Sequence, residues 1–100
     1  MNQPHALPAE LSIYTVAELH PQWLQWLSDP AGDAPFELDG GPVETADAAG
    51  VQLLVSLHAG LQRQGRTMHL RQPSQALLGA CDALGLQAWA QRLSPTAMKD

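Results

Sequence analysis

Side chains that could exchange protons are concentrated in the middle of the sequence. Four carboxylates follow one another there: Glu37, Asp39, Glu44 and Asp47. Paired carboxylates can serve as general acid and general base, but the spacing shows no recognisable Ser–His–Asp or Cys–His arrangement beside them. We interpret Asp47 as the N-cap of a helix and Asp39 as an acceptor that organises the loop after it. Catalysis is the distant alternative.

The other groups able to bind metals or act as bases are four histidines and one cysteine: His5, His20, His58, His69 and Cys81. No two of them stand at the spacing of a zinc site with a further ligand to complete it. We therefore predict structural histidines, no metal and no other cofactor. A catalytic site would require the fold to bring His58 or His69 into a cleft beside a carboxylate. Cys81 is expected to be an inert buried thiol, because it lies on the apolar stripe of a predicted helix.

The composition indicates one folded domain. The 100 residues are 45% hydrophobic, which fits a globular protein and argues against a disordered one. We predict a flexible segment over residues 1–8, the domain over residues 9–93 and a tail over residues 94–100. The N-terminus lacks a basic region followed by an apolar one, no apolar run reaches transmembrane length, and one cysteine can form no internal disulfide. These features predict a cytoplasmic protein that does not insert into a membrane.

The net charge of −5 is unevenly distributed along the chain. No Lys or Arg precedes Arg63, whereas most of the acidic residues do. A nucleic-acid-binding surface needs the opposite sign, so we exclude this class of partner. An acidic face could instead steer a basic partner, although a solvated surface that keeps the protein in solution is the simpler interpretation.

A strand and a helix position the central carboxylates. Apolar and acidic residues alternate over residues 36–39, which predicts a strand, and the Gly-Gly-Pro sequence after it stops that strand. From Ala48 the apolar residues recur at helical spacing. This stripe comprises Val51, Leu54, Leu57, His58 and Leu61. Asp47 stands directly before the helix as its natural N-cap, and such exposed turns beside a helix N-terminus often form binding sites.

Another strand and helix precede this central pair. Residues 11–14 alternate and favour a strand, after which Thr15 opens a helix. Trp23 lies on the apolar face of this helix and Trp26 lies beside that face, so Trp26 is expected to be partly exposed. Pro21 removes a backbone donor from the helix interior and should kink or split the helix.

One more strand and helix follow. Gly65 ends the central helix in the left-handed conformation, and residues 67–71 form the next strand. Ser74 caps a helix that Gly85 ends. The inward stripe of this helix comprises Leu77, Ala80, Cys81 and Leu84. Residues 86–93 add either a short strand or a helical turn. Three strand–helix repeats predict an α/β fold, with a largely parallel sheet and helices packed on it.

The central junction resembles the signature of a known family. Residues 38–51 read LDGGPVETADAAGV. In STAS domains, the family of anti-sigma factor antagonists, a strand with a Leu-Asp-hydrophobic pattern leads into Asp-Ser/Thr-Ser/Ala-Gly-hydrophobic at a helix start. The resemblance continues through residues 65–70, 74–77 and 84–86 and covers roughly three quarters of the chain. It implies a STAS-like fold with a mostly parallel or mixed four-stranded sheet in the order βαβαβα. The additional N-terminal strand of many STAS domains would come from residues before Leu11, where two prolines argue against it.

The sequence departs from this signature at two decisive positions. Phospho-regulated STAS proteins carry a serine or threonine just before or next to the glycine, and a phosphate at a helix N-terminus changes what can dock there. Here Ala48 and Ala49 have no oxygen to phosphorylate. Thr45 is the nearest hydroxyl, but it lies in the preceding loop and is more typical of a turn. We therefore predict a docking surface without a switch at Thr45, Asp47, Ala48, Ala49 and Gly50. The simpler alternative is that both alanines are small helix formers that allow close packing.

The resemblance implies a non-catalytic protein–protein docking module in bacterial regulation. It implies one of three partners: an anti-sigma factor or related kinase, a chemotaxis or two-component signalling protein, or a lipid-transport ATPase that the domain regulates. The missing hydroxyl disfavours the first partner, and the resemblance also allows a homodimer. The alternative is a domain that senses a small ligand, either a nucleotide or a lipid. A deep polar cavity beside Asp47 would favour ligand sensing, and a flat or convex face there would favour docking.

Overall fold

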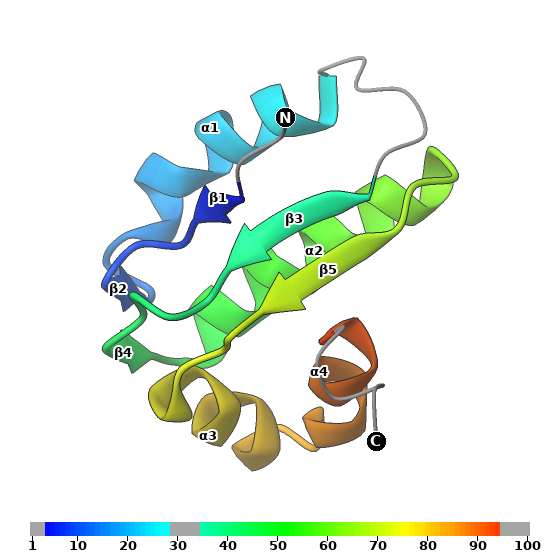
Figure 1. Ribbon diagram of the computed structural model, residues 1–100. Coiled ribbons are helices and arrows are strands. Elements are labelled where there is room, and N and C mark those ends of the chain that lie inside the picture. The colour runs from blue at the N-terminus through cyan, green and yellow to red at the C-terminus, as the bar shows by residue number, and fades with distance from the viewer. Residues whose placement is uncertain (1–3, 29–34, 95–100) are drawn as a thin grey trace.

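The computed structural model describes residues 4–28 and 35–94. In chain order its elements are β1 (His5–Ala6), β2 (Glu10–Leu11), α1 (Val16–Ser28), β3 (Phe36–Asp39), β4 (Thr45–Ala46), α2 (Ala48–Arg63), β5 (Met68–Arg71), α3 (Gln75–Ala83) and α4 (Gln87–Leu93) (Figure 1). All strand pairs in these ranges are parallel, which confirms the predicted α/β class and parallel pairing. The expected four-stranded sheet is wrong, because five strands form two sheets, β1-β3-β5 and β2-β4. Of the predicted tail, only Ser94 lies within the described residues.

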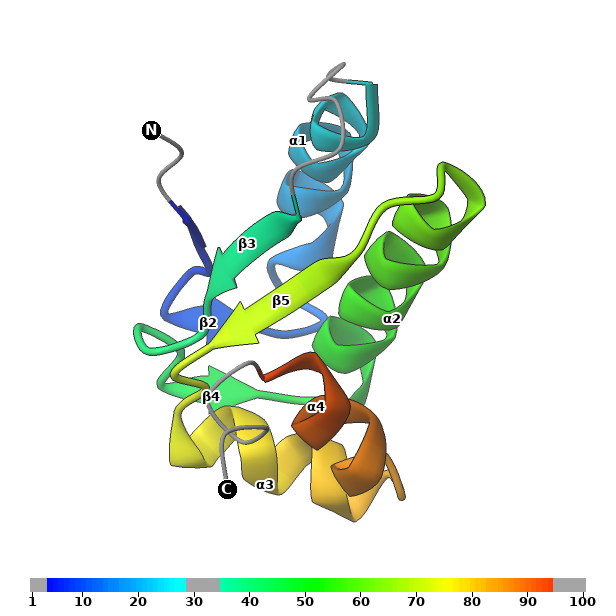
Figure 2. The same ribbon diagram turned by 45° about the vertical axis from the view of Figure 1, so that its right-hand side comes forward.

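The three-stranded sheet has one face that the long helices cover and one face that they leave open. The inward side chains of β3 and β5 are buried: Phe36, Leu38, Met68 and Leu70. Helix α2 runs behind these two strands (Figure 1). The alternate residues, such as Glu37 and His69, are only half-buried. Their face looks toward the viewer in Figure 1, and in Figure 2 α2 lies to the right of β5. In both views α3 and α4 lie together on the side of β5 away from α1.

The core forms where the apolar stripe of α2 meets the inner face of this sheet. Val51, Leu54 and Leu61 are 0% exposed and Leu57 is 2% exposed. The helical periodicity therefore identified the buried face of α2 correctly. Helix α1 packs against α2. Gly60 permits this approach, because a Cβ added to Gly60 would lie 2.9 Å from Cδ1 of Leu27 on α1.

The first described residues differ most from the prediction. Residues 5 and 6 form β1 and pair with the end of β3, so a strand does precede Leu11, contrary to the prediction. The flexibility of residues 1–8 stays a prediction. The ring of His5 stacks on that of Phe36 with 4.6 Å between the centroids. The two prolines, Pro4 and Pro8, restrict their own backbone and that of their neighbours to extended conformations. They therefore flank the strand without disrupting it.

Helix α1 is continuous through Pro21, so of the two predicted alternatives, a kink or a split, the split is wrong. Pro21 removes the hydrogen-bond donor to the carbonyl of Ala17, but both residues are exposed, so water can reach this carbonyl. Trp23 is buried, with 2% of its surface exposed. Trp26 is half-buried and stacks on Trp23 with 5.4 Å between ring centroids. Both tryptophans thus lie as predicted.

The C-terminal elements follow the predicted order closely. Ser74 caps α3 by accepting a hydrogen bond from the N–H of Leu77 at 3.1 Å. Gly65 has a φ angle of +75° and so adopts the predicted left-handed conformation, and Gly85, with a φ angle of +76°, adopts it as well. The segment after Gly85 is the helix α4, so the helical alternative for residues 86–93 is correct and the strand is wrong. Leu84 is not inward as predicted: it is the C-cap of α3 and is 40% exposed.

Candidate functional site

Asp47 caps α2 and also holds a distant segment of the chain. Its Oδ1 accepts a hydrogen bond from the N–H of Gly50 at 3.0 Å, which confirms the predicted N-cap. Its Oδ2 accepts a second hydrogen bond, from the N–H of Ile13 at 3.0 Å. Because both carboxylate oxygens are engaged, the start of α2 is fixed against the segment that follows β2.

The predicted docking residues differ in how far they reach the surface. Thr45 and Ala48 are exposed, Asp47 and Ala49 are half-buried, and Gly50 is buried. The methyl groups of both alanines therefore reach the surface, and neither alanine is enclosed in the core. This exposure argues against the alternative that both alanines serve only close packing. Thr45 does not lie in a loop as predicted, because it belongs to β4, which pairs with β2.

Gly50 is the point at which the helix and the β2 segment touch. A Cβ added to Gly50 would run into the backbone carbonyl of Leu11 and would lie 2.8 Å from Cγ of Leu11. Leu11 is 0% exposed, so this contact is internal. Gly50 thus contributes close packing under the surface, while Ala48 and Ala49 form the surface itself.

A turn beside this junction presents two apolar side chains to solvent. Ile13 is 60% exposed and Tyr14 is 84% exposed. The strand predicted over residues 11–14 is wrong beyond Leu11, because β2 contains only residues 10 and 11. The hydrogen bond from the N–H of Ile13 to Asp47 places this turn against the start of α2.

Side-chain hydrogen bonds give the turn a defined shape. The N–H of Ser12 donates to Oγ1 of Thr15 at 3.0 Å, and the N–H of Tyr14 donates to Oγ of Ser12 at 3.1 Å. The hydroxyl of Thr15 donates to the carbonyl of Glu10 at 3.0 Å. Ser and Thr commonly form such local turns. The pair Ser12 and Thr15 was therefore the sequence signal from which the turn, and the exposure of the two residues between them, could have been predicted.

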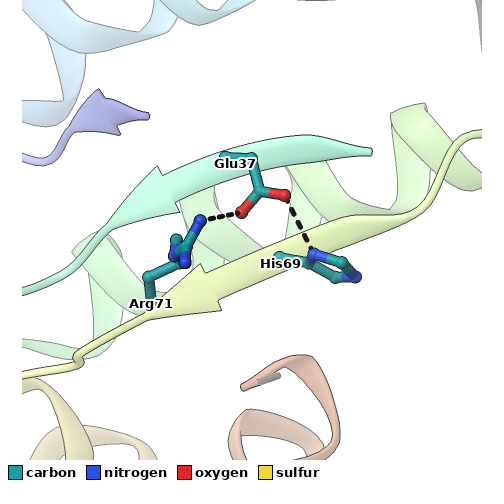
Figure 3. Close-up of polar contacts among 3 residues, drawn as sticks. All are labelled: Glu37, His69 and Arg71. Carbon is teal, nitrogen blue, oxygen red and sulfur yellow. Dashed lines mark hydrogen bonds and ion pairs between the residues drawn. The ribbon is translucent and has the colours of Figure 1, made fainter. Parts of the chain in front are cut away.

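The carboxylates on the strands each contact neighbouring groups, and one of them lies beside a histidine that lines a cavity, the pairing that the catalytic alternative requires. Oδ1 of Asp39 accepts a hydrogen bond from the N–H of Gly41 at 2.9 Å, so Asp39 organises the following loop as predicted. Glu37 lies on the open face of the sheet between two partners on β5 (Figure 3). One carboxylate oxygen lies 3.0 Å from Nδ1 of His69, and the other lies 3.4 Å from Nη1 of Arg71. The sequence did not indicate this ion-pair cluster, because it requires the register of β3 against β5.

The remaining histidine and cysteine of interest also contact the core. Nδ1 of His58 accepts a hydrogen bond from Nε1 of Trp89 at 3.1 Å, which joins α2 to α4. Burial, and secondly the charge of Arg92, lower the pKa of His58 below its usual value. Cys81 is 0% exposed, and burial raises the pKa of its thiol. A raised pKa disfavours the thiolate, which is the reactive form of cysteine.

Two cavities lie away from the Asp47 junction. One, of about 380 Å³, is lined by residues of α2, β5, α4 and the loop between α2 and β5. The other, of about 180 Å³, lies between α1 and α2. No residue from Thr45 to Gly50 lines either cavity. Within residues 4–28 and 35–94, no three His, Cys, Asp or Glu side chains are grouped so that they could hold a metal ion.

The parallel sheet and the capped helix start agree with the comparison to known families. A family model described as "Mlab, STAS domain" matches residues 6–94. The chain belongs to the STAS domain family. The match extends from β1 to the end of α4 and confirms the resemblance seen at residues 38–51. No curated protein and no solved structure gives a significant match to the chain.

Membership of the STAS family fits a regulatory or protein-interaction module. In this STAS domain, Ala48 and Ala49 directly precede the buried Gly50. Among the helices in the described ranges, none combines the length and apolar character needed to cross a membrane.

The capping carboxylate of this STAS domain should make its stability depend on pH. Hydrogen bonds from the backbone N–H of Ile13, and then of Gly50, lower the pKa of Asp47 below 3.8. A carboxyl with a depressed pKa in the folded state stabilises the fold above its unfolded pKa, and this contribution disappears as the pH falls through the folded pKa. The stability difference between the wild type and Asp47→Asn should therefore be present at neutral pH and should shrink below pH 3.8.

Urea denaturation of both proteins at neutral and acidic pH measures this difference. Asp82→Asn, at an exposed position of α3, controls for the loss of one negative charge. A difference between the wild type and Asp47→Asn that stays constant across this pH range would show that the ionised carboxylate does not stabilise the junction.

Proposed function

We propose that this STAS domain is a non-catalytic docking module that binds a partner protein through the start of α2 and the adjoining turn. We refer to Ile13, Tyr14, Thr45, Ala48 and Ala49 as the junction surface. The observation that carries the proposal is the exposure of Ala48 beside Ile13 and Tyr14 at a helix start that Asp47 holds in place. Exposed apolar side chains on an ordered scaffold are typical of interaction sites.

The polar residues around the junction surface suggest the chemistry of the partner. Glu10 and Glu44 are both exposed. Glu10 is paired with Thr45 across β2 and β4, and the N–H of Glu44 donates to the carbonyl of Ala9 at 2.7 Å. These carboxylates therefore border the junction surface. Because no basic residue precedes Arg63 in the sequence, we propose that the partner presents a basic rim around an apolar centre.

The role of such a module is an accessory one in a bacterial cytoplasmic system. A chemotaxis or two-component protein and a lipid-transport ATPase remain the preferred partners in this proposal. Antagonism of an anti-sigma factor ranks lower, because the hydroxyl needed for its phosphorylation switch is replaced by Ala48 and Ala49. Ligand sensing is the alternative function at this junction, and neither of the two cavities described above borders it.

Ala49→Glu tests the proposal directly. The new carboxylate would stand on a half-buried position of the surface and would have to be desolvated when the partner binds. We expect partner affinity to fall about tenfold or more. The partner is first recovered from cell extract with the wild-type protein, and its dissociation constant is then measured with each purified variant.

The matched control is Gln62→Glu, which adds a carboxyl group at an exposed position of the same helix. Gln62 lies roughly 20 Å from Ala49 along the helix axis, at a rise of about 1.5 Å per residue. Gln62→Glu should retain the affinity of the wild type. Equal affinity for the wild type and Ala49→Glu, with both proteins folded by circular dichroism, would refute docking at this surface.

A further inference from the structure

The larger cavity is positively charged although the chain as a whole is acidic. It has a volume of about 380 Å³ and lies beside β5, which is an edge strand of the three-stranded sheet. Its lining residues come from α2, the loop after it, β5 and α4: His58, Gln62, Arg66, Thr67, Met68, His69, Arg92 and Leu93. Two arginines and two histidines thus line the cavity, and none of these lining residues is acidic. The chain has ten acidic residues and only five Lys and Arg residues, so the charge of the cavity lining is opposite to the net charge of the chain.

Arg66 brings hydrogen-bond donors that are unsatisfied within the described part of the chain. Its Nε and Nη1 atoms are buried, and no residue in ranges 4–28 and 35–94 accepts a hydrogen bond from them. The guanidinium group lies over the ring of Phe36, with Cζ 5.4 Å from the ring centroid. This contact holds the group in place but provides no acceptor. These two buried atoms present almost no surface to a ligand, so they are not the donors that an anion would meet. Arg66 as a whole is half-buried and lines the cavity, and it therefore places a positive charge beside it.

In each of the two histidines that line the cavity, one ring nitrogen contacts a neighbouring side chain and the other does not take part in that contact. Nδ1 of His58 accepts a hydrogen bond from Nε1 of Trp89, which can only donate. Neutral His58 therefore carries its proton on Nε2 and can donate it to a ligand. Nδ1 of His69 faces Oε2 of Glu37 at 3.0 Å, so its Nε2 is the nitrogen that remains free of this contact.

One carboxylate lies close to the cavity, and it is already paired. Glu37 contacts both His69 and Arg71 on the open face of the sheet (Figure 3). It does not line the cavity and does not contact either of the two cavity arginines among the contacts described. Within residues 4–28 and 35–94, no carboxylate pairs with Arg66 or Arg92, so their charges are available to an added anion there.

We propose that this cavity binds a small phosphate monoester. Arg66, Arg92, His58, Thr67 and Gln62 together offer more donors than the two oxygens of a carboxylate can accept, whereas a phosphate presents three terminal oxygens. Met68 and Leu93 are buried beneath the site and provide an apolar wall for the organic part of the ligand. The cavity volume falls in the range typical of small-molecule sites. This site is distinct from the junction surface and does not depend on the docking proposal.

Calorimetric titration of the full chain tests this assignment. Inorganic phosphate and glycerol 3-phosphate are the two ligand arms, and sodium acetate at equal ionic strength is the control. We expect saturable binding of phosphate and little of acetate. Tighter binding of glycerol 3-phosphate would identify an organic monoester as the ligand, and tighter binding of inorganic phosphate would identify the free ion. NMR signals of the His58 and His69 rings should shift with the same dissociation constant.

Matched variants separate a specific site from a general effect of charge. Arg92 is exposed, so Arg92→Gln should leave the fold intact while weakening phosphate binding about tenfold or more. Arg63→Gln removes the same charge from an exposed residue that does not line the cavity, and should change binding less than about twofold. Gln62→Glu should weaken phosphate binding, and Ala49→Glu should not.

Three outcomes would overturn the proposal. They are the absence of saturable phosphate binding, equal binding of acetate, and equal weakening by Arg92→Gln and Arg63→Gln. Because Ala49→Glu affects only the junction surface, failure of phosphate binding leaves the docking proposal untouched, and failure of docking leaves the phosphate site untouched.

Discussion

Gly50→Ala is expected to lower the free energy of unfolding by about 3 kcal/mol or more, the upper part of the range for an overpacked core site. The added Cβ would overlap the carbonyl carbon and oxygen of Leu11. These are backbone atoms, so no side-chain rotation can relieve the overlap. The chain would have to separate α2 from the β2 segment, which would also strain the two hydrogen bonds of Asp47.

Gly79→Ala is the matched control for this prediction. Gly79 lies within α3, is exposed, and has no atom within 4 Å of an added Cβ. Since alanine favours a helix over glycine by about 0.5–1 kcal/mol, this variant should be slightly more stable than the wild type. Urea denaturation of both variants measures the two changes. Destabilisation of similar size in both, or none in Gly50→Ala, would contradict the close contact between Gly50 and Leu11.

The features that the sequence predicted well depend on neighbouring residues. The cap at Asp47 and the loop contact of Asp39 each involve atoms within three residues, so residue type and position were sufficient. The buried face of α2 followed from helical periodicity for a similar reason. The family resemblance at residues 38–51 also rests on this local pattern, which explains why the fold class was predictable.

The features that the sequence missed depend on segments that are distant in the chain. Alternation over residues 11–14 favoured a strand, but β4 offers β2 only two residues to pair with, so the pairing stops at Leu11. β1 forms because residues 5 and 6 meet the end of β3, although both flanking prolines suggested a loose segment. The phosphate site similarly combines residues from α2, β5 and α4, and no spacing in the sequence reveals it.

The exposed turn after β2 gives the second prediction with a large expected effect. Tyr14→Ala should weaken partner binding about 30-fold, or about 2 kcal/mol, because an exposed aromatic at the centre of an interface is often a dominant contact. The side chain is 84% exposed in the free protein. Its removal should therefore leave the free energy of unfolding unchanged within about 0.5 kcal/mol. A large loss of affinity without a loss of stability would distinguish a contact residue from a structural one.

Two control variants refine the role of Tyr14. Tyr14→Phe keeps the ring and should retain most of the affinity, since the ring supplies most of the contact area. Leu24→Ala truncates another exposed apolar residue, 48% exposed on α1 and outside the junction surface, and should have little effect on partner binding. Dissociation constants for the partner recovered with the wild-type protein measure all three. If Tyr14→Ala binds as tightly as the wild type while Ala49→Glu does not, the docking site is the helix start alone. The hydrogen bonds of Ser12 and Thr15 would then serve only to close the turn, and the exposed aromatic would have no part in recognition.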